Sequence, residues 1–282
     1  MPLSGAIASS RLRHMQPLSS HPILRRQGQM LSPSQDILAE EVPIALVYNG
    51  ISHAVLMASP QDLAELAIGF SLSEGILSRI EQLYDLQIEE QPLNAYSQAL
   101  RIELRIAGER FHLLQQRRRH MSGRSSCGLC GIDSLQAALP DIAPVARRNP
   151  LPLSDIQRAL ADMDAAQILR RQTGSLHAAA WAVKGDILAL YEDVGRHNAL
   201  DKLLGHLAQT GFNSEDGAVL ISSRASYEMI AKAAGMGISC LVAVSAATAL
   251  ALRLAEHSGI CLIGYARPEQ QNIYTHPEHI QA

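Results

Sequence analysis

Aromatic side chains, cysteines and long apolar runs are all scarce in this sequence. Phe, Trp and Tyr together make up 4% of the 282 residues, so a hydrophobic core must be built from Ala, Leu, Ile and Val. No apolar run reaches the roughly 18–20 residues of a membrane-spanning helix. The 4 cysteines are too few and too unevenly spaced for the disulfide framework of a small secreted protein. A formal net charge of −3 lacks the basic surplus that bulk nucleic-acid binding needs.

The rest of the composition is ordinary for a globular protein, with 47% hydrophobic and 18% charged residues. The first residues contain no apolar segment followed by a small-residue cleavage site, which argues against export. We therefore expect a cytoplasmic protein, and the length allows one large domain or two ordinary ones.

The first half of the chain predicts a tail followed by an α+β domain. Residues 1–34 are rich in Ser, Pro, Arg and Gln and have no sustained apolar period, which predicts a mobile tail. Residues 35–116 predict a small α+β domain, with a hairpin turn at Asn49-Gly50 and a helix that begins after Ser59. Its predicted strands cover residues 42–48, 51–57, 100–106 and 110–114.

Residues 117–150 differ from both flanks and predict a loop and linker. This segment begins with three consecutive arginines, contains Cys127-Gly128-Leu129-Cys130 between serines and glycines, and ends in a Pro-rich stretch.

The second half, residues 151–282, alternates helices and strands in the order α-β-β-α-β-α-β-α-β. Its strands at 217–221, 239–244 and 260–265 are continuously apolar, which is typical of a sheet covered on both faces. We predict an α/β fold with a mixed, mostly parallel sheet, and the element order is that of the cytidine-deaminase-like fold.

The CxxC loop is the strongest chemical signal. A thiolate is the reactive form of cysteine, and the neighbouring Arg117, Arg118, Arg119 and Arg124 favour that form at Cys127. Such a loop suits a sulfur that attacks a donor persulfide, with the second thiol placed to assist it or to resolve the persulfide as a disulfide. Three other readings stay open: a structural zinc site, a thioredoxin-like redox pair and a purely structural loop.

The second signal is a set of predicted helix starts that each follow a strand. Arg196-His197 opens one helix, Ser223-Arg224 precedes the next, and Ser245 to Thr248 precedes a third. Free backbone N–H groups and the added cations make such junctions suitable for phosphate, and several along one sheet edge fit a dinucleotide. Ordinary capping by Ser and Asn is the alternative reading.

Comparison with zinc deaminases excludes deamination. Those enzymes need a His-x-Glu at one helix start and a Pro-Cys-x-x-Cys at the next. Here the first reads His197-Asn198-Ala199, and hydroxyls of Ser223 and Ser226 stand in place of the thiolates. We therefore expect no resident metal. His177 fits either a core residue or a ligand contact, and Cys240 and Cys261 fit inert buried thiols.

Several long strings from about Glu40 onward resemble the FdhD family of formate dehydrogenase accessory proteins. They are EVPIALVYNGISH, AIGFSLSEGIL, SCGLCG, TGSLHAAAW, EDVGRHNALDKLLG, SSRASYEM, VSAATALA and GYARPEQQNIYTHP. The resemblance implies a homodimeric sulfurtransferase with a deaminase-like C-terminal domain. A cysteine desulfurase would load a persulfide onto Cys127, with Cys130 as its partner thiol. The sulfur would then pass to the molybdenum bis(molybdopterin guanine dinucleotide) cofactor before its insertion into formate dehydrogenase.

The resemblance also implies which residues bind that cofactor. They lie after the last predicted strand, at Tyr265, Ala266, Arg267, Pro268, Glu269 and Gln270, of which only Arg267 is cationic. A chaperone of a different class, which binds the molybdenum cofactor without catalysis and uses the CxxC as a redox latch, is the alternative.

Overall fold

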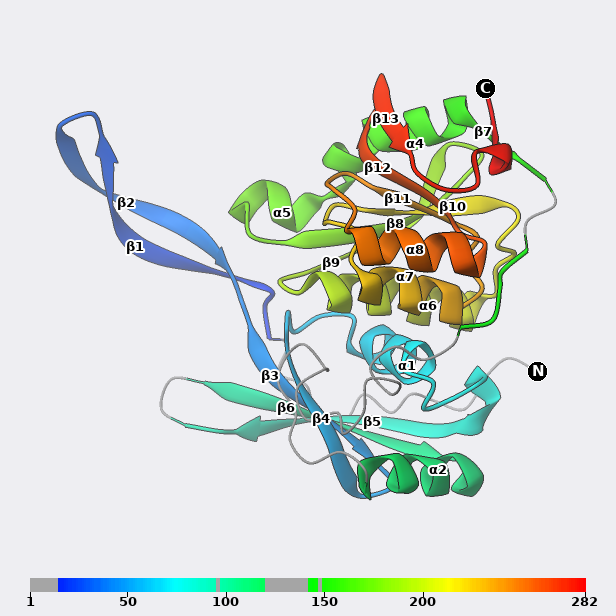
Figure 1. Ribbon diagram of the computed structural model, residues 1–282. Coiled ribbons are helices and arrows are strands. Elements are labelled where there is room, and N and C mark those ends of the chain that lie inside the picture. The colour runs from blue at the N-terminus through cyan, green and yellow to red at the C-terminus, as the bar shows by residue number, and fades with distance from the viewer. Residues whose placement is uncertain (1–14, 95–96, 120–141, 147–148) are drawn as a thin grey trace.

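The computed structural model describes residues 15–94, 97–119, 142–146 and 149–282, and Cys127 and Cys130 lie outside these ranges. The described chain forms an N-terminal α+β domain and a larger C-terminal α/β domain that pack against each other, with a two-stranded arm that projects from them (Figure 1). No helix among the described residues has both the length and the apolar character needed to cross a bilayer.

The N-terminal domain is a four-stranded sheet with two helices, α1 and α2, that contribute to its core. Its strand order is β4-β3-β6-β5, with antiparallel outer pairs around the parallel pair β3–β6. The predicted turn at Asn49-Gly50 is confirmed, since both residues have positive φ between β3 and β4. The bounds are β3 Val42–Tyr48, β4 Ile51–Ala58, α1 Leu63–Ser73, the short 3₁₀ helix Ile80–Gln82, β5 Leu83–Pro92, β6 Gln98–Ile106 and α2 Gly108–Arg119.

One predicted strand in this domain is wrong. Residues 110–114 form part of α2, where Phe111 and Leu114 turn toward the core. Most residues of α2 are Glu, Leu, Gln and Arg, all good helix formers, and that preference outweighs the short run that resembled a strand. Strand β5, which the sequence reading missed, takes the predicted strand's place beside β6.

The N-terminal segment also differs from the mobile tail predicted for residues 1–34. Strands β1 (Leu18–Gln27) and β2 (Met30–Ala39) pair in antiparallel register over their whole length and form the arm. Pro22 and Pro33 obscured this hairpin, because proline is excluded from interior strands. Both strands of a two-stranded ribbon are edge strands, so proline is tolerated there.

The C-terminal domain is a six-stranded mixed sheet between helices. The strand order is β13-β12-β11-β10-β8-β9, and only the neighbours β10, β11 and β12 pair in parallel. The predicted mixed α/β fold is confirmed, but the sheet is not mostly parallel as predicted: two of its five strand pairs are parallel and three are antiparallel. Strands β8 and β9, and strands β12 and β13, follow each other through short turns, which impose antiparallel pairing at both edges of the sheet. The likeness to cytidine deaminases stays a prediction. The strands are β8 His177–Val183, β9 Asp186–Asp193, β10 Gly217–Ile221, β11 Cys240–Ala243, β12 Cys261–Arg267 and β13 Gln270–Ile273.

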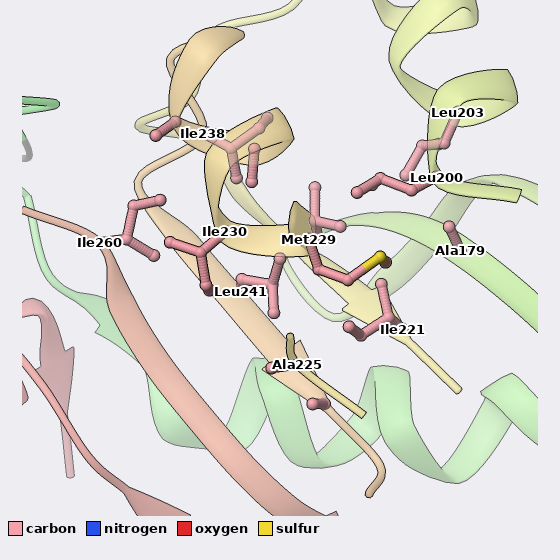
Figure 2. Close-up of a cluster of buried hydrophobic side chains, with 14 of the residues drawn as sticks. Ala179, Leu200, Leu203, Ile221, Ala225, Met229, Ile230, Ile238, Leu241 and Ile260 are labelled. Carbon is pink, nitrogen blue, oxygen red and sulfur yellow. The ribbon is translucent and has the colours of Figure 1, made fainter. Parts of the chain in front are cut away.

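Helices cover both faces of this sheet. Helices α6, α7 and α8 pack on one face, and α4 packs on the other, where Cys240 and Cys261 are buried as predicted. Figure 2 shows the first face, whose buried side chains are Ala, Leu, Ile and Val except for Met229 and Trp181. The helices are α4 Leu153–Ala166, α5 Ile168–Thr173, α6 Arg196–Thr210, α7 Tyr227–Gly235 and α8 Ala249–Ser258. The chain ends with the 3₁₀ helix Pro277–His279 and β14 Ile280–Gln281, which pairs with β7 Leu151–Pro152.

The two domains meet where α1 lies against α6. Gly69 and Gly205 stand at the crossing, and a Cβ on either would collide with backbone of the opposite helix. Glycine at both positions therefore permits backbone-to-backbone contact. At one end of the contact, Lys232 on α7 binds Asp201 and Glu74.

Candidate functional site

The predicted helix starts gather at one edge of the C-terminal sheet. Strands β9, β10 and β11 all end there, and α6, α7 and α8 begin there. Two junctions are joined directly, because Ala225 after β10 pairs with Ala247 after β11 and accepts a hydrogen bond from the Thr248 N–H. The structure therefore brings together segments that are far apart in the sequence, as expected for the carboxyl ends of parallel strands.

Side-chain capping explains only one of the three helix starts. Thr248 caps α8 by accepting from the Ala251 N–H, but Gly195 and Ser226, at the starts of α6 and α7, make no side-chain cap bond. The other candidate cap residues are used elsewhere: Ser222 Oγ accepts from the Ala178 N–H, and Asn198 Nδ2 donates to the Met57 carbonyl. The first turns of α6 and α7 are thus without a side-chain cap from their N-cap residues, and free helix N–H groups of this kind attract anions.

Three buried polar atoms around these two helix starts have no hydrogen-bond partner among the described residues. They are Nε of Arg196, Oγ of Ser226 and the phenol oxygen of Tyr227. Buried polar groups are normally paired, and an unpaired one costs about 1–3 kcal/mol. Their concentration at these two helix starts makes this sheet edge the candidate binding site.

The local charge is positive. Burial and the neighbouring Arg196, Arg170 and His197 lower the pKa of His177. The Glu228 carboxylate is paired: it lies 2.7 Å from His197 Nε2, and this hydrogen bond is the largest cause that lowers the Glu228 pKa. His197 therefore faces Glu228, and Arg196 and Arg224 carry the positive charge that is left for a ligand.

A buried carboxylate that the sequence reading left without a role holds the first helix start. Asp193, completely buried, accepts hydrogen bonds from the Gly195 N–H at 2.8 Å and from Asn198 Nδ2 at 2.9 Å. It also accepts from the Ser59 N–H of the other domain and binds Lys202 at 2.7 Å. Hydrogen bonds to Asp193 thus hold the Gly195-Arg196-His197 turn in place, and one of them comes from the N-terminal domain. Only the fold places Ser59 and Lys202 beside Asp193, so no local pattern in the sequence signals this network.

The predicted cofactor-binding residues 265–270 span the end of β12, the turn at 268–269 and the first residue of β13. Tyr265 has φ of 50° at a register shift in β12, and Ala266 is buried. Arg267 donates to the Val244 carbonyl at 2.6 Å, which anchors it at the same sheet edge as the helix starts. Pro268, Glu269 and Gln270 are exposed, and Gln270 begins β13.

Two of the arginines that precede the CxxC loop have partners in the N-terminal domain. Arg110 and Arg117 donate to backbone carbonyls that follow α1, at Ile76 and Gly75, so these two cations serve the fold. The predicted sulfur residues Cys127 and Cys130 lie outside the described residues.

Comparison with known proteins agrees with this architecture. Residues 39–281 match the FdhD/NarQ family. A sulfur carrier protein FdhD from Cupriavidus necator is 48% identical over 258 residues, which cover 91% of this chain and 87% of that protein. A crystal structure described as a formate dehydrogenase accessory protein, from Desulfotalea psychrophila, has the same fold, with a TM-score of 0.74 at 24% identity over 94% of this chain and 100% of that one. The chain belongs to the FdhD/NarQ family.

Proposed function

We propose that this protein is a sulfur carrier of the sulfurtransferase type. Cys127 accepts persulfide sulfur from a cysteine desulfurase and delivers it to the molybdenum bis(molybdopterin guanine dinucleotide) cofactor before that cofactor enters formate dehydrogenase. The printed name of the Cupriavidus necator relative supports the sulfur-carrying role. The observation that carries the cofactor part is the cationic sheet edge, with two uncapped helix starts and three unpaired buried polar atoms.

The phosphates of the cofactor are negatively charged hydrogen-bond acceptors, and this sheet edge offers positively charged and backbone donors to bind them. The starts of α6 and α7 offer backbone N–H groups, with Arg196 and Arg224 beside them. Arg267 approaches from the end of β12, and Ser223, His197 and the 265–270 stretch complete the proposed contacts. Charged donors to phosphate are stronger than neutral ones, and arginine suits phosphate geometry particularly well. A cofactor with two guanine dinucleotide arms has a phosphate pair for each helix start.

The sulfur chemistry rests on the two thiols of the loop. The Cys127 thiolate attacks the outer sulfur of the donor persulfide, breaks the donor S–S bond and becomes a persulfide itself. Release of that outer sulfur as sulfide needs two electrons. The Cys130 thiol supplies them if it attacks the inner sulfur and forms a disulfide with Cys127.

Intact-mass measurement tests the carrier step. After incubation with a cysteine desulfurase and cysteine, the wild type should gain one sulfur, which is lost as sulfide on reduction. Cys127→Ala should gain none and should abolish maturation of active formate dehydrogenase, whereas Cys130→Ala should still be loaded. Full dehydrogenase activity with Cys127→Ala would disprove the carrier role and favour a chaperone that binds cofactor without transferring sulfur.

Calorimetry with GDP, which represents one end of the cofactor, tests the binding edge. One charge-assisted hydrogen bond is worth about 1.5–3 kcal/mol, so Arg196→Ala and Arg224→Ala should each weaken binding by roughly ten- to a hundredfold. Arg253→Ala, which removes an exposed cation from the middle of α8, is the matched control and should leave binding unchanged. Sulfur loading should survive Arg224→Ala. Equal GDP affinity in all four proteins would mean that the phosphates bind elsewhere.

A further inference from the structure

A His-Pro-Glu-His turn after β13 brings three metal-binding side chains together. The His279 N–H donates to the His276 carbonyl at 3.0 Å and closes the 3₁₀ helix that begins at Pro277. Residues i and i+3 lie above one another in such a helix, and the two imidazole rings accordingly stack with centroids 5.2 Å apart. His276, Glu278 and His279 each offer a ligand atom within 4.8 Å of the others. Elsewhere in the described ranges, no three His, Cys, Asp or Glu side chains converge in this way.

The turn is fixed to the neighbouring elements by three hydrogen bonds. The buried Thr275 hydroxyl donates to the Ile260 carbonyl at 2.7 Å and accepts from the Leu262 N–H at 2.9 Å. His276 Nε2 donates to the Glu256 carbonyl at 3.1 Å, in the last turn of α8. The backbone and the first ring of the turn are therefore held in place by groups outside it.

The bond to Glu256 decides which nitrogen of His276 carries a proton. A carbonyl oxygen only accepts, so Nε2 is the donor, and in the neutral ring Nδ1 then presents a lone pair. That atom lies 3.1 Å from a carboxylate oxygen of Glu278, which is an acceptor as well. Two acceptors this close need a cation beside them, either a proton on Nδ1 or a metal ion. Metal-bound histidines usually donate their other N–H to a carbonyl or carboxylate, as this one does.

We propose that His276, Glu278 and His279 bind a divalent transition-metal ion, with zinc as the best match. Two imidazoles and one carboxylate form a set of three protein ligands that leaves a position for water. With ligand bonds of about 2.0–2.1 Å, two ligand atoms 3.1 Å apart subtend roughly 95–100° at the ion, which lies between octahedral and tetrahedral geometry. A small rotation of the His279 ring closes the set. The Glu278 side chain is 65% exposed, so an ion can enter from solvent.

An ion at this turn would fasten the end of the described chain to α8. Coordination through Nδ1 makes the Nε2–H a stronger donor to the Glu256 carbonyl. Strand β14 begins at Ile280, directly after the turn, and pairs with β7, so that pair is held as well. The turn lies about 15 Å along the 10-residue α8 from the helix start at the candidate binding edge. The lack of a deaminase ligand at Ala199 does not bear on this set, which lies elsewhere in the fold.

Calorimetric titration with Zn²⁺ tests the site on the full chain without an affinity tag. Cys127→Ser/Cys130→Ser is the background protein, because those thiols would bind zinc too. It should bind one ion, unfold at a higher temperature with zinc, and exchange amide hydrogens more slowly in the 3₁₀ turn and β14. Glu278→Gln and His279→Gln should each weaken binding more than about tenfold, since even a change beside a metal ligand costs that much. His257→Gln, which removes an exposed imidazole from the end of α8, is the matched control and should bind zinc unchanged.

Three outcomes would overturn the proposal. No zinc uptake at micromolar concentration would mean that a proton alone joins His276 and Glu278. Unchanged zinc affinity in Glu278→Gln and His279→Gln would place the ion elsewhere. Equal weakening by His257→Gln would show that the end of α8, and not the turn, binds it. Glu278→Gln alters an exposed side chain, so its fold should persist, and unfolding without zinc checks this. None of these outcomes bears on sulfur loading or GDP binding, which test the proposed function separately.

Discussion

Two buried Lys–Asp pairs flank the contact between the domains, and they differ in what surrounds them. Asp193 and Lys202 are both completely inaccessible, and Asp193 also accepts hydrogen bonds from Ser59, Gly195 and Asn198. Lys232 instead sits between Asp201 and the half-exposed Glu74, so it keeps a second partner near solvent. The first pair fixes the geometry of the candidate site, whereas the second fastens α7 to α1 and α6. The degree of burial therefore does not distinguish the ion pair that holds the candidate site from the pair that holds the helices together.

The largest predicted effect follows from breaking the first pair. Asp193→Ala leaves the Lys202 ammonium buried without a counter-charge, which should lower the free energy of unfolding by about 3–5 kcal/mol. It also releases the Gly195 turn, so GDP binding should weaken. Urea denaturation and calorimetry measure the two effects.

The double variant Asp193→Ala/Lys202→Met separates stability from site geometry. Replacing a buried ion pair with apolar groups is often nearly neutral, so most of the lost stability should return. GDP binding should stay weak, because the Gly195 N–H and Asn198 still lack their acceptor. Recovery of GDP affinity together with stability would contradict the role of Asp193 in holding the site.

A smaller effect is expected at the second pair. Burial raises the pKa of Asp201, so this group can neutralise itself when its cation is removed. Lys232→Met should therefore cost less, about 2–3 kcal/mol near pH 8. A raised pKa means that the folded state binds more protons than the unfolded state, so the loss should shrink as the pH falls from 8 toward 5. Urea titrations at several pH values test this, and a loss that grows on acidification would refute it.

The smallest effect is expected at the half-exposed pair of Glu228 and His197. Such pairs contribute about 0–1 kcal/mol, so Glu228→Gln should change the free energy of unfolding by less than about 1 kcal/mol. It also removes a negative charge from beside Arg196, so GDP affinity should hold or rise. A clear loss of GDP affinity in this variant would show that Glu228 contacts the ligand or positions Arg196.

The sequence predicted elements best where a single local pattern decides them. Strand 217–221 is uniformly apolar and was placed at its exact bounds, and Asn49-Gly50 has few alternatives to a tight turn. The sequence predicted secondary structure less well in segments that bury few side chains. The arm does not pack on a core, and α2 buries only part of its surface, so neither segment has a clear apolar periodicity.

The candidate site could be located but not assembled from the sequence. The parallel arrangement of β10 and β11 was enough to predict that Ser223-Arg224 and the Thr248 junction share an edge. Whether a serine caps a helix depends on the direction of its side chain, which the sequence does not give. Ser226 stands at the N-cap position of α7 but its side chain makes no capping hydrogen bond. The Asp193 network depends on Ser59, which no periodicity connects to it.

The glycine-lined crossing of α1 and α6 has a consequence for synthesis on the ribosome. The bond between Ser59 and Asp193 joins residues 134 positions apart, so the side of α1 that α6 covers is completed long after α1 has been made. Contacts of such high sequence separation form slowly, and an N-terminal domain generally folds first. A nascent chain of this protein thus presents a bare helix face until α6 emerges, and that interval is when it most needs protection by a chaperone.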